Sequence, residues 1–570
     1  MKSVESRIQD LVYNVDSGIG LRLIKVLLYI LAVGSVVLLY TANQFRGLRE
    51  AEAMDYAQLG RNVTIQSPWL VTQTVRPASL GYLIRNTDDP YPSLHQHPDI
   101  VHPPVYPILL NLFFRGANFA ATPQGSMHVY GPEHRVMVLN HIFALLTGIF
   151  VLLLGRRLFD PTIGMLGMTL YYLSDSVWRT SLGGTGVAIA SFWGVAAIYA
   201  MVIAVSRITD GARLRRWIGP VIVAGLLCSL AFLTRYAAIV LVPGLMIYLG
   251  WALRQRAWQG LAIFLLVFMI PASLWIARNA VVAGGPFGLA PYLALNETRD
   301  YPGNAFERTL ATDTSFVSIL AAAREKLLPN FSAYYDTQLM GWGDGLLMAL
   351  FITTFFYRFV RFPVHSLRWG LALSMVLLLF VGAVYGESAF RLAQMFWPLI
   401  ILYGLAFFML LLERLQLPYK FLNRGMIGVV LFLTALPLIF TLMPPRAGPT
   451  YPPYAPRLIA MVTQLLRPQE AICSDMPWAN AWYGDRTSLL LPVNVETFYD
   501  IHDFHDRLSG LYFTLKTRDL PLISGLQAPE FESWRNVMEG RLPADFPLPQ
   551  ATTLAGVDQL FFSDRPRWAE

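Results

Sequence analysis

The chain has 570 residues, of which 55% are hydrophobic and only 14% are charged. Its mean hydropathy is +0.46 and its pI is about 9.2. Soluble domains carry about 25% charged residues, so this composition excludes an ordinary soluble protein and indicates an integral membrane protein. The basic excess requires no nucleic-acid partner, because membrane proteins concentrate Lys and Arg in cytoplasmic loops. Two cysteines, Cys228 and Cys473, are too few for a disulfide framework.

Eleven apolar segments are candidates for membrane-spanning helices, which need about 20 mostly apolar residues each. Two of them are short for this rule. The first follows the mixed-charge segment 1–21 and has no clear small-x-small cleavage site, so we expect a span and not a cleaved signal peptide. In chain order, the candidates are 22–42, 136–155, 161–175, 182–206, 217–233, 237–253, 260–280, 341–357, 369–385, 395–412 and 425–443.

Basic residues are divided unevenly between the two sets of short loops. If the N-terminus is cytoplasmic, the loops on the opposite side hold only Arg179, Arg235 and Arg391. The positive-inside rule therefore predicts a cytoplasmic N-terminus and an external C-terminus. The cytoplasmic loops would hold Arg156, Arg157, Arg207, Arg213, Arg215, Arg216, Arg254, Arg256, Arg358, Arg361, Arg368, Arg414, Lys420 and Arg424.

This topology predicts three parts: a cytoplasmic segment 1–21, a transmembrane bundle 22–443 and an external domain 444–570. The external loops 43–135 and 281–340 belong to the bundle. The tail opens with the proline-rich stretch "MPPRAGPTYPPYAPR" and then alternates short apolar runs with helix-like ones, which is typical of a small α/β domain. Its clustered aromatic residues either stack on sugars or fill a core, and the core is favoured: Trp478, Trp482 and Tyr483.

Ionisable residues are nearly absent from the interiors of the predicted spans, with His141 as the main exception. Arg235, Asp344, Glu387 and Arg391 all fall at predicted external ends. Ion-coupled transporters usually need such groups within the membrane. The pattern therefore favours an enzyme that works at the outer interface over a transporter.

Several stretches together resemble the GT-C glycosyltransferases. They are "DYAQLGRNV", "HPPVYPILLNLFF", "LGRRLFDPTIGMLG", "FLTRYAAIVLVPGL", "PASLWIARNAVVAGGPFG" and "ESAFRLAQMFWPLII", in this order. Their order, spacing and sidedness resemble the branch that contains protein O-mannosyltransferases and the lipid A aminoarabinose transferase. The resemblance covers about residues 20–412. It implies an enzyme that takes a sugar from a polyprenyl-phosphate carrier and passes it to an acceptor at the external face.

The resemblance also implies a role for an acid in the first external loop, which here falls on Asp55. Such an acid binds or deprotonates the acceptor nucleophile. Chemistry supports this role independently, since a hydroxyl or amine attacking an anomeric carbon needs a positioned base. The alternative is an acid near a helix N-terminus, which the helix dipole favours. Tyr56, Leu59 and Val63 are spaced to share one face of that helix, and Glu52 is the second candidate base.

A second acid, which relatives often carry after the next external turn, is missing. The stretch "SDSVWRTSLGGTGVAIASF" has Gly184, Thr185 and Gly186 where that acid is expected. Asp175 lies earlier and is an alternative. The substitution leaves the acceptor type open, as well as any metal held between two acids.

The expected leaving group is a lipid phosphate, and arginine is the side chain best suited to bind phosphate. Arg235, Arg391 and Arg278 lie at predicted external span ends and are the candidate ligands. The alternative is that each side chain reaches toward lipid headgroups. Arg391 has a further alternative, because Glu387 precedes it by one helical turn.

The stretch "HQHPDIVHPP" contains ligand types that bind zinc, in His95, His97, Asp99 and His102. The prolines also suit an extended loop, and "HPP" matches the proline pair of the family without a metal. We therefore assign no metal site, keep the three histidines as weak candidates, and leave a divalent metal open as a cofactor.

The prediction is a mainly α, polytopic GT-C bundle of about eleven spans with a small external α/β domain, in a bacterial inner membrane. Its partners would be a polyprenyl-phosphate-linked sugar, a lipid, glycan or protein acceptor, and the bilayer. The alternatives are a polysaccharide ligase or polymerase of similar architecture, a transporter or flippase, and a non-catalytic scaffold. Intramembrane charges and an inverted repeat would favour a transporter, and neither is seen in the sequence.

Overall fold

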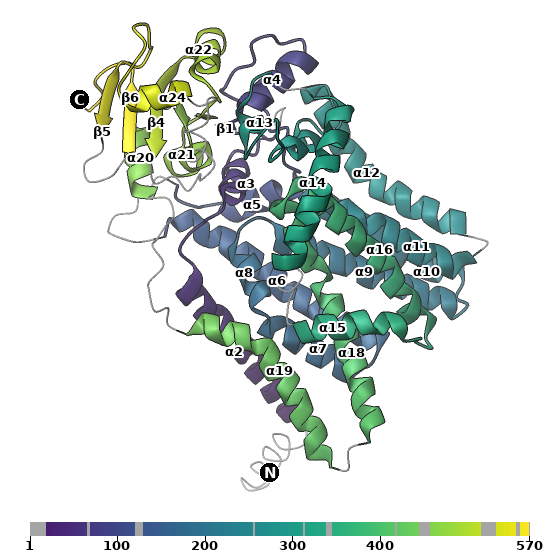
Figure 1. Ribbon diagram of the computed structural model, residues 1–570. Helices are drawn as coiled ribbons and strands as arrows, with labels where there is room; N and C mark the ends of the chain where they lie inside the picture. The colour runs from purple at the N-terminus through teal and green to yellow at the C-terminus, as the bar shows by residue number, and fades with distance from the viewer. Residues whose placement is uncertain are drawn as a thin grey trace, which may run out of the picture.

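The computed structural model describes residues 19–64, 69–119, 129–254, 257–311, 314–337, 345–416, 419–443, 456–514, 532–553 and 559–568. Most of the predicted segment 1–21 and of the proline-rich stretch, and Asp344, lie outside these ranges. The described residues form a helical bundle with a small mixed sheet at one end (Figure 1). The predicted fold class, a mainly α membrane protein with a small α/β domain, is confirmed.

Nine apolar helices within the described ranges are long enough to cross a bilayer. Some are broken into consecutive pieces by short 3-10 turns. They are α2 (Ile19–Gln44), α6 (Gly131–Leu158), α9 (Val187–Thr209), α10 (Leu214–Thr234), η1 with α11 (Tyr236–Val240, Leu241–Leu253), α12 (Ala257–Ala283), α16 (Phe362–Tyr385), α17 with η5 and α18 (Glu387–Phe390, Arg391–Phe396, Trp397–Leu415), and α19 (Lys420–Leu442).

The other two of the eleven predicted spans are short helices. One is α7 (Pro161–Leu173), and the other is α15 (Gly345–Thr353), which continues into the turn η4 (Thr354–Phe356). The 13 residues of α7 extend over about 20 Å at 1.5 Å per residue. This is less than the hydrocarbon thickness of about 30 Å, so α7 crosses only part of a bilayer.

Helices α6 and α7 pack closely because glycines lie at their contact. A Cβ atom on Gly155 would lie 2.6 Å from the Cα of Gly164, and one on Gly164 would lie 2.7 Å from the carbonyl oxygen of Leu152. Small residues allow membrane helices to approach in this way. An alanine at either position would push the two helices apart.

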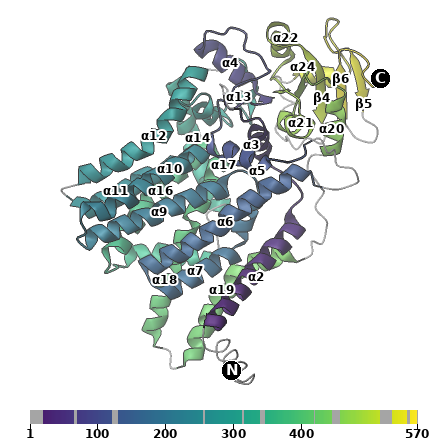
Figure 2. The same cartoon turned by 180° about the vertical axis from the view of Figure 1, so that it is seen from behind.

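Helices α2 and α19 lie side by side at the edge of the bundle, as the two opposite views show (Figures 1 and 2). Only 6% of the apolar stretch of α2 is buried within the protein, so its surface suits contact with lipid. Their ends are joined by two hydrogen bonds. Asn43 donates to the carbonyl of Leu442 at 3.1 Å, and Gln44 donates to the carbonyl of Thr441 at 2.9 Å.

The sheet combines the C-terminal domain with a strand from the first long loop. Its strand order is β1-β3-β2-β4-β6-β5. The neighbours β1/β3, β3/β2 and β2/β4 are parallel, whereas β4/β6 and β6/β5 are antiparallel. The strands are β1 (Thr74–Val75), β2 (Ala471–Ser474), β3 (Ser488–Leu490), β4 (Leu508–Thr514), β5 (Gln550–Thr553) and β6 (Gln559–Ser563).

Four helices pack around this sheet, and two of them connect parallel strands as crossovers. Trp478, Trp482 and Tyr483 are all buried in one hydrophobic cluster, as the core interpretation predicts. That cluster also contains side chains of the first long loop, so the C-terminal domain and the loop share a core. The helices are α20 (Pro456–Gln464), α21 (Pro477–Gly484), α22 (Val495–Phe504) and α24 (Glu532–Met538).

Shorter helices from the long loops complete the end of the bundle that carries the sheet. The predicted amphipathic helix is α3 (Ala51–Arg61), with Tyr56 and Leu59 buried. Val63 lies beyond the end of α3 and forms an isolated bridge with Leu70. The other helices of the long loops are α4 (Pro77–Asn86), α5 (Val105–Phe114), η3 (Ala290–Leu295), α13 (Ala305–Arg308) and the longer α14 (Phe316–Thr337). Helix α8 (Asp175–Leu182) lies in the short connection between α7 and α9.

Candidate active site

Helix α3 places three acidic residues close together at the end of the bundle near the sheet. Glu50 is at the N-cap position, Glu52 lies in the first turn, and Asp55 follows three residues later. Asp55 is buried, with 1% exposure. The helix packs tightly on α5 because a Cβ atom on Gly60 would lie 2.6 Å from the Cβ of Leu110. This packing fixes the position of α3 against α5.

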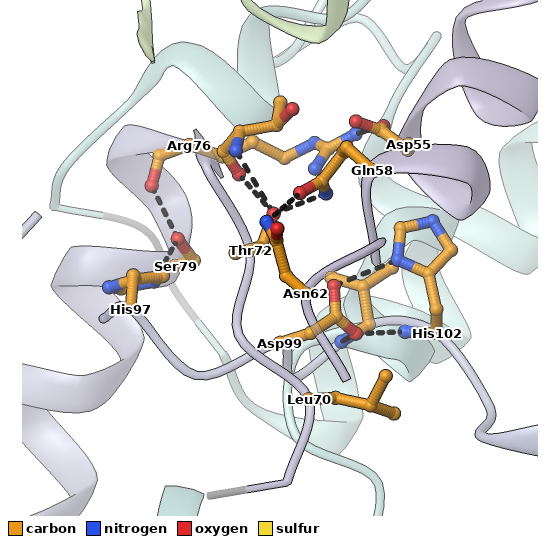
Figure 3. A network of polar contacts seen from close by, with 12 residues as sticks. Asp55, Gln58, Asn62, Leu70, Thr72, Arg76, Ser79, His97, Asp99 and His102 are labelled. Carbon is orange, nitrogen blue, oxygen red and sulfur yellow. Dashed lines mark hydrogen bonds and ion pairs between the residues drawn. The ribbon is translucent and has the colours of Figure 1, made fainter. Parts of the chain in front are cut away.

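Arg76 lies between the carboxylates of Asp55 and Glu307 (Figure 3 shows Asp55 and Arg76). Its Nη2 is 2.6 Å from Oδ2 of Asp55, and its Nε is 2.5 Å from Oε2 of Glu307. Burial lowers the pKa of the Arg76 guanidinium, but the two carboxylates outweigh burial and raise this pKa above its ordinary value. Oδ1 of Asp55 is buried and has no hydrogen-bond partner among the described residues. One oxygen of Asp55 is therefore fixed and the other is available.

Glu52 and Arg235 form a second, separate ion pair. Oε1 of Glu52 lies 2.9 Å from Nη2 of Arg235, and Ser388 donates its hydroxyl to Oε2 of Glu52 at 3.0 Å. Arg235 also donates to the backbone carbonyls of Thr185 at 2.6 Å and Ser388 at 2.9 Å. Arg235 is only 6% exposed. Its guanidinium is thus already bound on several sides by the protein.

A cavity of about 320 Å³ opens beside the start of α3. Two arginines and two glutamates form part of its wall, and much of the remaining wall is apolar. A phosphate on an apolar chain needs this combination, since arginine binds the phosphate and apolar surface covers the chain. The lining includes Glu50, Arg179, Glu387 and Arg391 on the charged part, and Val187, Phe390, Trp397 and Ile400 on the apolar part.

The two arginines of the cavity take part in partly exposed ion pairs. Arg391 lies 3.1 Å from both Glu50 and Glu387, with its own side chain 30% exposed. Arg179 pairs with the buried Asp175, while its own side chain is 75% exposed. Exposed ion pairs contribute only about 0–1 kcal/mol. A dianionic ligand can therefore compete for these two guanidinium groups more easily than for Arg235.

Arg278, the third predicted phosphate ligand, is not part of the lining of this cavity. It donates to the backbone carbonyl of Asp99 at 2.6 Å and to the side chain of Asn279 at 3.0 Å. Its guanidinium lies over the ring of Trp275, 4.8 Å from the ring centre. These contacts anchor the backbone of the first long loop to α12.

The weak zinc candidates do not share one site. Figure 3 shows His97 beside Ser79 and His102 beside Asp99. In the described parts of the chain, no group of three or more His, Cys, Asp or Glu side chains could hold a metal ion. The geometry of these residues therefore does not fit a bound metal. The contacts are His97 to Ser79 at 2.9 Å, His102 to Asp99 at 2.9 Å, and His95 to Thr487 at 3.2 Å.

The two glycines at the position of the expected second acid cannot accept a larger side chain without strain. Gly184 has a φ of 70° and Gly186 has a φ of 74°, in the left-handed region that favours glycine. A Cβ atom on Gly184 would lie 2.8 Å from the side chain of Leu48, and one on Gly186 would lie 2.8 Å from Tyr106. Asp175, the proposed substitute, accepts a hydrogen bond from Tyr40 at 3.1 Å and pairs with Arg179.

Comparison with known proteins agrees with this architecture. Residues 101–275 match the family model described as dolichyl-phosphate-mannose-protein mannosyltransferase. These residues are therefore similar to a family of membrane glycosyltransferases, and the chain has the GT-C fold. Enzymes of this family use sugars carried on polyprenyl phosphates. No curated protein matches the GT-C chain significantly.

Solved structures resemble this GT-C enzyme at low sequence identity. ArnT from Cupriavidus metallidurans bound to undecaprenyl phosphate is 10% identical with a TM-score of 0.53, covering 95% of this chain and 98% of ArnT. The oligosaccharyltransferase of Archaeoglobus fulgidus, in complex with Zn and sulfate, is 14% identical with a TM-score of 0.49, covering 85% and 70%. The likeness to ArnT extends the GT-C fold over the C-terminal domain.

Three residues of this candidate site were not among the sequence-based candidates. Arg76 and Glu307 lie in the predicted external loops and gave no motif of their own, and Arg179 was used only to orient the spans. For Arg179, an available signal was its position four residues after Asp175, which places both on one helix face. No comparable signal joins Arg76 to Glu307, because they come from different loops.

Proposed function

We propose that this GT-C enzyme transfers one sugar from a polyprenyl-phosphate carrier to a lipid, glycan or protein acceptor at the external face of a bacterial inner membrane. The observation that carries the proposal is the cavity with Arg179 and Arg391 beside helix α3, which also bears Asp55. The solved ArnT structure was bound to undecaprenyl phosphate. That ligand joins a phosphate to an apolar chain, and the arginines and apolar wall of this cavity suit such a ligand.

In this proposal the carrier phosphate binds in the cavity, against Arg179 and Arg391. The bond between the anomeric carbon and the phosphate oxygen breaks, and its electron pair leaves with the polyprenyl phosphate. Two guanidinium groups stabilise the charge of this leaving group. Arg235 has a structural role in this proposal, because it joins α3 to the residues around Ser388.

Asp55 is proposed as the general base. As the acceptor oxygen or nitrogen forms a bond to the anomeric carbon, its proton passes to Oδ1 of Asp55, the buried oxygen without a partner among the described residues. Glu52 is the less suitable base, because Arg235 and Ser388 already occupy its two oxygens. The proposal routes no step through a metal, since the described side chains do not gather into a metal site.

The test is sugar transfer by the full-length protein in lipid nanodiscs. The donors are undecaprenyl phosphates that carry mannose or aminoarabinose, the sugars of the two related families. Asp55→Asn keeps the shape of the side chain but cannot accept a proton, so transfer should fall by about 100- to 10,000-fold. Donor binding and thermal stability should stay close to wild type.

The matched control is Asp160→Asn. Asp160 caps α7 by accepting hydrogen bonds from the backbone N–H groups of Thr162 and Ile163. Asparagine caps a helix about as well as aspartate, so this variant should keep full activity. Wild-type turnover by Asp55→Asn would contradict the assignment of the base, and turnover lost only in Glu52→Gln would move the role to Glu52.

A further inference from the structure

Arg76 is fixed by the sheet of the C-terminal domain. It directly follows β1, whose residues Thr74 and Val75 pair with Ser488 and Leu489 of β3. The N–H of Ser488 also donates to the backbone carbonyl of Gln73 at 2.7 Å. The direction in which the Arg76 side chain leaves the backbone is therefore set by a strand that the C-terminal domain holds in place.

Asp55 is connected to the same domain through the last residue of its helix. Arg61, at the end of α3, donates to the carbonyl oxygens of Ala481 at 2.8 Å and Trp482 at 3.3 Å in α21. It also forms an ion pair with Asp485 at 2.9 Å. Helix α3 is thus attached to the C-terminal domain at one end and carries Asp55 about two turns away.

Glu307 is connected to this domain through the residue that follows it. Arg308 donates from its side chain to the carbonyl of Leu491 at 3.1 Å, and its own carbonyl accepts from the N–H of Val493 at 3.1 Å. Arg308 is 1% exposed, so this attachment is buried. All three members of the Asp55–Arg76–Glu307 cluster are therefore positioned by contacts with residues that surround strand β3.

The geometry within the cluster gives Arg76 two different contacts. One edge of its planar guanidinium binds Oδ2 of Asp55, and Nε binds Glu307. A planar group held at both places restricts the rotation of the Asp55 carboxylate, which a flexible lysine ammonium could not do. Oδ1 of Asp55 then keeps one direction, as general-base catalysis requires.

The two carboxylates of the cluster already have a cation between them, the guanidinium of Arg76. Two carboxylates close together attract either a metal ion or a cationic side chain. Here the guanidinium of Arg76 lies between them, at 2.6 Å from Asp55 and 2.5 Å from Glu307. The side chain of His102 also interacts electrostatically with Asp55.

We propose that Arg76, fixed by the C-terminal sheet, is the positioning residue of the site: it orients the Asp55 carboxylate and takes the place between Asp55 and Glu307 that a divalent cation would otherwise occupy. The C-terminal domain then acts as the scaffold of the acidic cluster. The inference rests on the proposed function, in which Asp55 is the base.

The experiment compares Arg76→Gln, Arg76→Lys and Glu307→Gln in the transfer assay across a range of pH. Arg76→Gln removes the cation, and transfer should fall by about 100-fold with little change in the KM of the donor. The acidic limb of its pH–rate profile should move to higher pH by about 1 to 3 pH units, because a buried carboxylate without its cation takes up a proton more readily. Arg76→Lys keeps the charge, so its acidic limb should stay near that of wild type while its rate remains low.

For Glu307→Gln we expect a shift of the pH–rate profile in the opposite direction. It removes a negative charge from the cluster, so the acidic limb should move downward while the rate falls. A general loss of folding cannot move the two profiles in opposite directions. Arg299→Gln is the matched control, since Arg299 has a side chain that is 92% exposed and should leave both rate and profile unchanged. Wild-type transfer should also be unaffected by EDTA.

Several results would overturn the inference. Full activity of Arg76→Gln beside an inactive Asp55→Asn would remove the role of Arg76 and leave the proposed function standing. Full activity of Asp55→Asn would reject the proposed function itself, and the inference with it. If Arg76→Gln fails to fold, an unshifted profile of Glu307→Gln overturns the inference and a downward shift supports it. Loss of transfer in EDTA that Mg²⁺ or Mn²⁺ restores would show that Arg76 does not replace a cation.

Discussion

Arg235 and Glu52 form an ion pair of 2.9 Å that joins helix α3 to the chain segment following α10. The pair is largely buried, with side-chain exposures of 6% for Arg235 and 24% for Glu52. Arg391, by contrast, reaches Glu50 and Glu387 across the wall of the cavity and is 30% exposed. Two arginines that look alike in the sequence are therefore expected to differ in role.

Replacing Arg235 by alanine should destabilise the protein by about 3–5 kcal/mol, because Glu52 would be left without its charged partner. Arg235→Lys should also lower the unfolding temperature, since an ammonium cannot reach the carbonyls of both Thr185 and Ser388. Thermal unfolding in detergent measures both effects. Arg391→Ala is the comparison and should unfold close to wild type. An Arg235→Lys variant with wild-type stability and weak donor binding would instead support the original prediction that Arg235 holds the phosphate.

Replacing Arg391 or Arg179 should weaken binding of the donor. The expected effect of Arg391→Lys is a rise of about tenfold in the KM of the polyprenyl-phosphate sugar, because lysine lacks the planar fork that matches two phosphate oxygens. Arg179→Lys should act in the same direction. Steady-state transfer assays measure this, with the exposed Arg299→Lys as the control. An unchanged KM in both variants would show that these side chains only contact lipid headgroups or their neighbouring acids.

Alkaline phosphatase fused after Glu570 should be active, because the predicted topology places the C-terminus outside the cytoplasm. The reason is the excess of Lys and Arg in the loops of the opposite side, which orients the bundle. Alkaline phosphatase, which folds only in an oxidising compartment, and green fluorescent protein, which fluoresces inside, form a suitable pair of reporters. A fluorescent and phosphatase-negative fusion would reverse the predicted orientation and place the acidic cluster on the cytoplasmic side.

The buried pair of His102 and Asp99 should make stability depend on pH. Burial raises the pKa of Asp99, but His102 and then Arg278 outweigh it and lower this pKa overall. Burial lowers the pKa of His102, but Asp99 outweighs it and raises this pKa above 6.5. The contribution of His102 is therefore fully present below about pH 6.5 and is lost as the pH rises through its folded-state pKa. That of Asp99 is present above about pH 3.8 and is lost as the pH falls.

The unfolding temperature of the wild type, measured between pH 5 and pH 9, should therefore decline on the alkaline side. His102→Gln should remove most of this decline and should lower stability mainly at acidic pH. His97→Gln is a useful control, because burial lowers the pKa of His97 to about 4 and keeps its ring neutral over this range. Identical slopes for the wild type and His102→Gln would show that the pair does not titrate in this window.

The sequence by itself determined the features that depend on local composition. Runs of apolar residues define the spans, since a bilayer requires about 20 such residues. One run proved too short to cross a bilayer as a single helix, α7. Helix α3 with Asp55 and Glu52 follows from a local pattern, and the family resemblance follows from motifs in order. These properties need no knowledge of which distant segments meet.

The tertiary structure alone decided which charges from distant segments are paired. Arg76 meets both Asp55 and Glu307 because β1 joins the sheet of the C-terminal domain and α13 attaches to the same domain. Likewise, packing buries Arg235 and pairs its guanidinium with Glu52 and two backbone carbonyls, whereas Arg391 stays partly exposed. An ion pair between segments far apart in the chain depends on how whole helices and strands pack, and neither hydropathy nor spacing carries that information. The sequence therefore indicates the class of enzyme and the helix that bears its acids, while packing decides which arginine holds each acid.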